Sequence, residues 1–135
     1  MPAGYSGTPL AKKLGLKPGM RCWFRDMPDS VRAEIDPAGL GIEEYAAACA
    51  GLQAAHVFVT ERARLERELA ALLALIDRNG FIWVSWPKKA ARVETDVTED
   101  VIRAVALPMG LVDIKVCAVD PVWSGLKLVI RRENR

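Results

Sequence analysis

The turn after the first expected strand constrains this chain more than any other feature. Residues 20–25 read as a mostly apolar strand, and the chain continues Asp26-Met27-Pro28-Asp29. In α/β proteins that hold a nucleotide-type cofactor, glycines at this turn let the backbone approach the phosphate or cofactor closely. Pro28 has no N–H to donate, and its ring fixes φ. The turn therefore predicts a domain with no cofactor.

Strands alternate with helices along the rest of the chain. The connection 120–125 is too short for a crossover helix, so the last two strands are predicted to be antiparallel. Short right-handed crossovers then give an α/β fold, a three-layer Rossmann-like sandwich whose mostly parallel five-stranded sheet ends in a C-terminal antiparallel hairpin. The expected strands are 20–25, 54–59, 81–86, 111–119 and 126–132. The expected helices are 9–14, 28–35, a weaker one at 42–50, one between Thr60 and Gly80, and one that begins near Asp96 or Thr98.

Length and composition set the class of protein. At 135 residues the chain has room for one core, so residues 1–135 are expected to form a single domain. The net charge of +2 argues against nucleic acid and acidic membrane as partners. The longest helical apolar run, 69–76, is too short to span a membrane. Three widely spaced cysteines and no secretory pattern predict a reduced, cytoplasmic protein.

Two parts of the chain resemble the class I methyltransferases. They are Leu16-Lys17-Pro18-Gly19-Met20-Arg21 before the first strand, and Phe81-Ile82-Trp83-Val84-Ser85-Trp86 with the closing hairpin. The resemblance implies a sheet order of 1-2-3-5-4 for the five expected strands. However, a single crossover, 26–53, stands where those enzymes have several strands, and the glycine turn is missing. We therefore expect a truncated relative that does not transfer methyl groups.

Longer matches cover nearly the whole chain. They are Gly4-Tyr5-Ser6-Gly7-Thr8-Pro9-Leu10, Trp86-Pro87-Lys88-Lys89, the run 110–120 and Trp123-Ser124-Gly125-Leu126-Lys127. Together they resemble the bacterial domain-of-unknown-function family number three thousand and fifty-two. The resemblance implies a small cytosolic bacterial protein and assigns no catalytic residue.

The loop after the third strand is the first candidate site, because ligands of open α/β sheets bind beyond the carboxyl ends of the strands. Its cations stand next to a helix N-terminus, where they could hold a phosphate or carboxylate. The alternative is a solvated basic loop beside an ordinary helix cap. The candidate residues are Lys88, Lys89, Arg92, Thr95, Asp96 and Thr98, with Lys127 joining them from the last strand.

The C-terminal hairpin is the second candidate site. Strict alternation puts Asp113 and Lys115 on one face of the fourth strand, where burial could shift their pKa values toward acid–base work. The alternative is a cross-strand ion pair and a tight turn with a tryptophan packed over it. The candidate residues are Asp113, Lys115, Asp120, Trp123, Ser124 and Lys127.

The remaining candidate residues are expected to have structural roles rather than catalytic or metal-binding ones. His56, the only histidine, lies in an apolar strand and is expected to be a hydrogen-bonded core residue. The cysteines and His56 have no ligand spacing, so we expect no metal site. Trp83 and Trp86 lie on opposite faces of one strand, which predicts burial on both sides; an exposed tryptophan would suit a homodimer contact. Stacking of single-stranded nucleic acid on Trp86 is a further alternative.

The sequence therefore favours a non-catalytic binding or interaction domain that lacks a nucleotide-cofactor site and has no catalytic residue. The alternative is a small anion-binding protein or enzyme that uses the loop 88–98 and the hairpin. The ligand, the partner and the oligomeric state are not predicted.

Overall fold

A six-stranded sheet forms the centre of the computed structural model, which describes residues 8–135. The strand order is β2-β1-β3-β4-β6-β5, with β2, β1, β3 and β4 parallel to one another. Strand β6 runs antiparallel to β4 and to β5, so the chain ends in the predicted hairpin. The strands are β1 (Arg21–Arg25), β2 (Glu43–Tyr45), β3 (Leu52–Phe58), β4 (Ile76–Pro87), β5 (Leu111–Ala118) and β6 (Trp123–Ile130).

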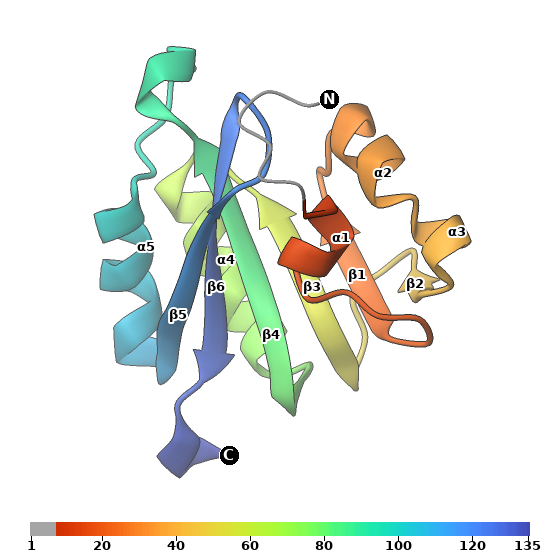
Figure 1. The fold of residues 1–135 in the computed structure, drawn as a ribbon. Coiled ribbons are helices and arrows are strands. Elements are labelled where there is room, and N and C mark those ends of the chain that lie inside the picture. Colours follow the sequence, from red (N-terminus) through yellow and green to blue (C-terminus); the bar gives the residue numbers. More distant parts are fainter. Residues whose placement is uncertain (1–7) are drawn as a thin grey trace.

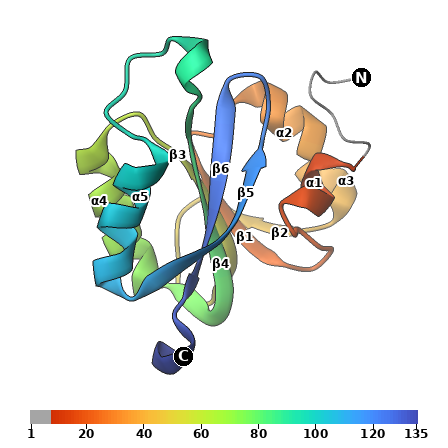
Figure 2. The ribbon, with the colours of Figure 1, turned by 60° about the vertical axis from the view of Figure 1, so that its left-hand side comes forward.

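Helices cover both faces of this sheet, which gives three layers (Figures 1 and 2). One face carries α4 and α5, and the other carries α1, α2 and α3. The helices are α1 (Leu10–Lys13), α2 (Asp29–Ile35), α3 (Pro37–Leu40), α4 (Arg62–Leu73) and α5 (Glu99–Ala106). Short 3₁₀ turns follow at Lys89–Ala91, Leu107–Met109 and Arg132–Asn134. No helix in the described range is long and apolar enough to cross a membrane.

The buried side chains divide into two clusters, one on each face of the sheet. Along β3, Val57 packs toward α4 and α5 while Phe58 packs toward α1 and α2, as expected for a central strand buried on both sides. Helix α4 contributes Leu65, Leu69 and Leu72 at helical spacing. The two clusters fix the sheet between the helix layers and hold the carboxyl ends of the parallel strands in place.

The predicted α/β architecture is confirmed, and so is the order of the five expected strands within the sheet. The main difference is β2, which occupies part of the segment predicted as a helix at 42–50. It pairs with β1 through only three residues and forms one edge of the sheet. A second difference lies at the end of α4, which stops at Leu73, so that β4 begins at Ile76 rather than Phe81.

A bulge in β5 changes which residues share a face. The pairing with β6 shifts between Asp113 and Lys115, so the strict alternation expected from the sequence breaks there. Asp113 faces α5, where its carboxylate accepts a hydrogen bond from Arg103 at 3.0 Å. Lys115 faces α1 instead, and its amine donates to the carbonyl of Lys13 at 3.3 Å. The prediction that Asp113 and Lys115 lie on one face is therefore wrong.

Candidate functional site

The most promising place for a ligand is the carboxyl edge of the sheet beside β1. The chain leaves β1 toward β2 on one side and later returns to β3 on the other, so the order reverses between β1 and β3. Open α/β sheets bind ligands at such a switch point, beyond the carboxyl ends of the strands. Asp26, the first residue after β1, has φ 56°, a left-handed conformation that Asp tolerates better than most residues. Pro28 occupies the N-cap of α2 and makes no side-chain capping bond.

A groove of about 360 Å³ opens beside this edge, on the side of β1 that faces α4. Three segments form its walls: the end of β1, the small residues after β2, and one side of α4. The groove is lined by Trp23, Phe24, Arg25, Asp26, Ala46, Ala47, Ala48, Arg67, Glu68, Ala71 and Leu72. Four alanines leave the space open, and buried Trp23 and Leu72 make part of the lining apolar. This combination is typical of small-molecule pockets.

Charged side chains surround the groove in pairs. The guanidinium of Arg25 lies 3.1 Å from the carboxylate of Glu68 and also covers the Trp23 ring at 5.1 Å. Arg25 Nε nevertheless has no hydrogen-bond partner, so this contact is an ion pair without aligned hydrogen-bond geometry. Arg64 and Asp26 form a second pair at 3.0 Å.

One cation of the groove is not neutralised. Arg67 is exposed and forms no ion pair within residues 8–135. The groove therefore offers two carboxylates held by arginines and one arginine without a carboxylate partner.

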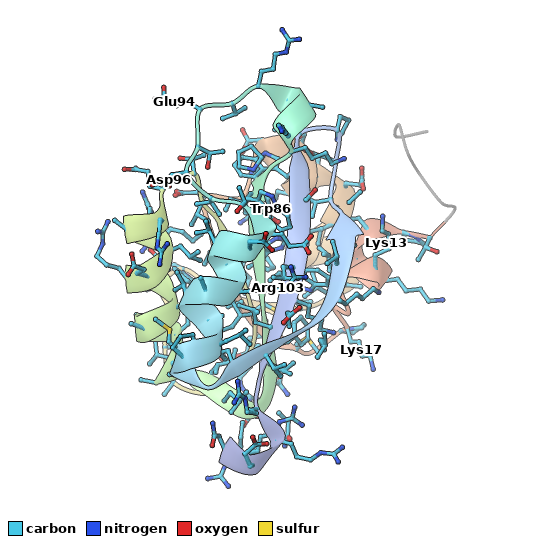
Figure 3. The ribbon with its side chains drawn as sticks, turned by 90° about the vertical axis from the view of Figure 1, so that its left-hand side faces the viewer. Lys13, Lys17, Trp86, Glu94, Asp96 and Arg103 are labelled. Atoms are coloured by element: carbon cyan, nitrogen blue, oxygen red, sulfur yellow. The ribbon has the colours of Figure 1, made fainter. Side chains whose placement is uncertain are left out.

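The candidate loop after β4 is hydrogen-bonded to the neighbouring turn between β3 and α4. Asp96 accepts a hydrogen bond from the Arg62 backbone N–H at 2.6 Å, and Thr95 donates to the Thr60 carbonyl at 2.7 Å. Asp96 thus caps α4, whereas Thr98 caps its own helix α5 through the Val101 N–H. Figure 3 shows Asp96 at the upper end of α4, with Glu94 above it on the loop.

The space beside Thr95 and Asp96 is acidic. It measures about 450 Å³ and is lined by Thr60, Glu61, Glu94, Thr95 and Asp96. Three carboxylates in one opening repel an anion, so this geometry does not favour the phosphate site considered from the sequence.

The structure does not bring the lysines of the two candidate sites together. The Lys88 backbone N–H donates to the Val122 carbonyl, and Lys89 is exposed at the start of the 3₁₀ turn. Lys127 pairs with Trp83, four residues before Pro87 along β4, which corresponds to about 13 Å of strand. No pocket described in residues 8–135 contains both Lys88 and Lys127.

The other hairpin candidates have structural partners. Asp113 bonds to Arg103 of α5, and the Asp120 carboxylate accepts from the N–H groups of Val122 and Trp123 at 2.8 and 2.7 Å. Trp123 packs edge-on against Phe58 with ring centroids 5.2 Å apart. Ser124 sits in the strand ladder between Trp86 and Ala118. The hairpin residues shape the turn and fix it to the sheet.

His56 is a core residue with one hydrogen bond, as the sequence predicts. Its Nε2 lies 2.7 Å from the Ser85 hydroxyl, and its ring stacks on Phe58 at 4.3 Å. Burial lowers the pKa of His56 from 6.5 to about 3, so the ring is neutral near pH 7. Within the described range, no group of three or more His, Cys, Asp or Glu side chains is arranged to hold a metal ion.

Sequence reasoning missed the groove. Its small residues, Ala46–Ala48, fall in the segment predicted as a helix, and nothing in the sequence indicates that they face α4. One indication was available in the sequence. Arg67, Glu68 and Ala71 belong to a helix whose buried side is already formed by leucines, so these three residues are free to line a surface groove.

The fold is similar to the folds of several solved structures, some of them named as methyltransferases. No protein-family model and no curated protein matches the sequence. Among solved structures, a SAM-dependent methyltransferase from Aquifex aeolicus is similar at TM-score 0.59 and 13% identity, over 90% of this chain and 88% of that one. Magnesium protoporphyrin IX methyltransferase from Synechocystis, with bound SAM, gives TM-score 0.58 and 11% identity over 90% and 74%. LepI in complex with SAM gives TM-score 0.55 and 14% identity, and this chain spans 39% of it.

These similarities correct two predictions. A non-catalytic domain without a nucleotide-cofactor site is contradicted, because the similar structures include proteins solved with S-adenosylmethionine (SAM) and proteins named as methyltransferases. The expectation that a non-enzyme is the better reading of the chain is contradicted on the same ground. The turn after β1 has side chains in place of glycines and includes Pro28, which has no N–H, but it does not close the adjacent groove. The resemblance to a family of unknown function stays a prediction, and Gly4–Gly7 of its first motif lie outside the described residues.

Proposed function

We propose that this chain binds S-adenosylmethionine in the groove beside β1 and acts in methyl transfer. The observation that carries the proposal is that the groove is lined by the carboxyl end of β1, the strand that borders the switch point. The similar structures solved with SAM support it. The volume of about 360 Å³ falls within the ordinary range of small-molecule sites.

The residues that line the groove fit the parts of such a ligand. Ala46, Ala47 and Ala71 leave room for a flat adenine ring against apolar Leu72. The carboxylate of Glu68 can accept hydrogen bonds from ribose hydroxyls. Arg67, the unpaired cation, suits the carboxylate of the methionine part, because a guanidinium binds a carboxylate through two parallel hydrogen bonds.

Recognition by side chains replaces recognition by a glycine turn. The turn after β1 contains Pro28, and its only left-handed residue, Asp26, forms an ion pair with Arg64. Pro28 contributes no N–H at this turn, and the charges of α4 add polar contacts from the other wall of the groove. SAM carries a methyl group on a positively charged sulfur, which makes that carbon open to attack by a nucleophile. The protein's own contribution is to bind and orient the ligand at the edge of the sheet.

The test is binding of SAM and of S-adenosylhomocysteine, measured by calorimetry and by the shift in melting temperature. We expect Ala71→Trp to abolish binding because the indole fills the groove. Ala70→Trp is the matched control, because Ala70 is exposed on the same helix and does not line the groove. Arg67→Gln should weaken binding, whereas Arg78→Gln, an exposed arginine outside the groove, should not.

Methyl transfer is tested by adding a metabolite extract as the source of acceptor. Formation of S-adenosylhomocysteine by the wild type and not by Ala71→Trp supports the proposal. Absence of SAM binding to the wild type, or equal loss in Ala70→Trp and Ala71→Trp, contradicts the assignment of the groove.

A further inference from the structure

Two lysines face each other directly across the hairpin, on the side of the sheet away from the groove. Lys115 of β5 and Lys127 of β6 are partners in the strand register. Both amines reach the segment around α1. Lys115 Nζ donates to the Lys13 carbonyl at 3.3 Å, and Lys127 Nζ lies 3.4 Å from where a Cβ on Gly15 would stand. Like charges directly opposite on neighbouring strands destabilise a sheet.

Two more lysines from the α1 segment add to the same charge. Lys13 lies close to Lys115, and its amine donates to the Ala118 carbonyl at 3.0 Å. Lys17 is exposed, and Figure 3 shows Lys13 and Lys17 on the flank of the molecule away from α4 and α5. In the part of the chain that the structure describes, none of the four lysines forms a salt bridge with a carboxylate.

The bulge in β5 creates this arrangement. Without it, Lys115 would alternate onto the same face as Asp113, toward α5 and the guanidinium of Arg103. The shift turns Lys115 toward α1 and opposite Lys127. An edge strand can carry a lysine merely to prevent pairing with another chain. That role does not explain Lys127, because β6 is an inner strand.

Lys127 is held in place and partly removed from water. Its amine lies 4.2 Å from the centre of the Phe81 ring and 6.0 Å from that of Trp83. Burial, together with the charges of Lys115 and Lys17, lowers the pKa of Lys127. A half-buried amine among other amines gains from any anion that comes between them.

We propose that Lys17, Lys115 and Lys127, with Lys13 beside them, form a binding site for a small multivalent phosphate anion, such as a phosphoryl or pyrophosphoryl group. The site is compact, and the net charge of the chain is only +2, which favours a small anion over a long nucleic acid. The site is separate from the SAM groove, because it lies on the opposite face of the sheet.

The probe is inorganic pyrophosphate, compared with sodium chloride at the same ionic strength. We expect pyrophosphate to raise the melting temperature and to shift the NMR signals of the Gly15 region. Lys127→Met keeps the methylene packing over Phe81 but removes the charge, and should lower the affinity about tenfold or more. Lys115→Met should do the same, while raising the melting temperature without the anion, because it removes the like-charge pair.

The matched controls are Lys88→Met and Lys89→Met, which remove the same charge from the remote loop. Retained binding in both controls supports the site. Equal loss in all four variants indicates general attraction to net charge and overturns the proposal. The proposal is also overturned if a single-stranded oligonucleotide binds more tightly than pyrophosphate and if that binding is lost in the Lys88 and Lys89 variants. If Lys127→Met is poorly folded, Lys17→Gln takes its place, because Lys17 is exposed. Lys17→Gln must then weaken pyrophosphate binding, and full affinity of this variant overturns the proposal.

Ala71→Trp should leave the pyrophosphate response unchanged, so failure of the pyrophosphate site and failure of the SAM site are seen separately.

Discussion

The Nε2 atom of His56 lies 2.7 Å from the hydroxyl of Ser85 in the interior of the protein, while the Nδ1 atom of the same ring has no hydrogen-bond partner. A neutral imidazole carries one N–H and one acceptor nitrogen, so the single partner leaves half of its polar capacity unused. Protonation would add a charge in a place that water does not reach. The pair is therefore a point at which acid weakens the fold.

We expect stability to fall between about pH 6.5 and pH 3 because of this histidine. The unfolded chain binds the proton near pH 6.5, whereas burial delays protonation in the folded state to about pH 3. Between these values the unfolded state holds more protons, so the free energy of unfolding decreases as pH falls, at up to about 1.4 kcal/mol per pH unit. Urea unfolding at pH 7.0 and 5.0 measures the loss.

The His56→Leu variant separates this effect from carboxylate titration. It should lose much less stability than the wild type between pH 7.0 and 5.0, because His56 is the only histidine in the chain. An equal loss in both proteins would assign the acid sensitivity to other groups.

Asp96 stabilises the start of α4. Its carboxylate accepts from the Arg62 N–H at 2.6 Å, so Asp96→Ala leaves a helix N-terminus uncapped and should cost about 0.5–2 kcal/mol. Chemical denaturation gives the value. Glu94→Ala, in the same loop, should change stability by less than about 0.5 kcal/mol, because Glu94 is exposed. Equal effects of the two substitutions would disprove the capping role.

Substitutions of Asp26 test whether the left-handed backbone conformation of the turn after β1 limits stability. The φ of 56° at Asp26 costs alanine more than aspartate, whose short polar side chain can hydrogen-bond locally, so Asp26→Ala should destabilise the fold by up to about 1–2 kcal/mol. Asp26→Gly loses the exposed ion pair with Arg64 but relieves the strained φ, and should be neutral within about 0.5 kcal/mol. The order of the two melting temperatures is the measurement; an Ala variant as stable as the Gly variant would contradict the backbone argument.

The strong local patterns of the sequence predicted the fold well. The apolar run at 54–59 indicates a strand buried on both faces, and β3 is such a strand. Leu65, Leu69 and Leu72 of α4 recur at helical spacing and are buried. Trp83 and Trp86 pack into opposite clusters, as alternation along one strand requires.

Features that depend on pairing with distant strands were not visible. Strand β2 is Glu43-Glu44-Tyr45, a short and polar edge strand that forms only because β1 offers it a ladder. The bulge at Asp113 and Lys115 has no glycine or proline to mark it, so alternation gave the wrong face for Lys115. The groove depends on β2 and the lysine pair depends on the bulge, and this is why neither site could be assembled from the sequence.

Cysteine reactivity offers a footprint of the groove. Cys22 is fully buried, and burial raises its pKa to about 12, so it should react with a thiol reagent only after unfolding. Cys49 is partly exposed and follows Ala48, a residue that lines the groove, so it should react in the native state. We expect SAM to slow alkylation of Cys49 and to leave Cys117, near Lys13 and Lys115, unaffected. Mass spectrometry of the labelled peptides at increasing SAM concentration gives both rates. Equal protection of Cys49 and Cys117 would indicate general tightening of the fold, and unchanged Cys49 labelling at saturating ligand would place the ligand elsewhere.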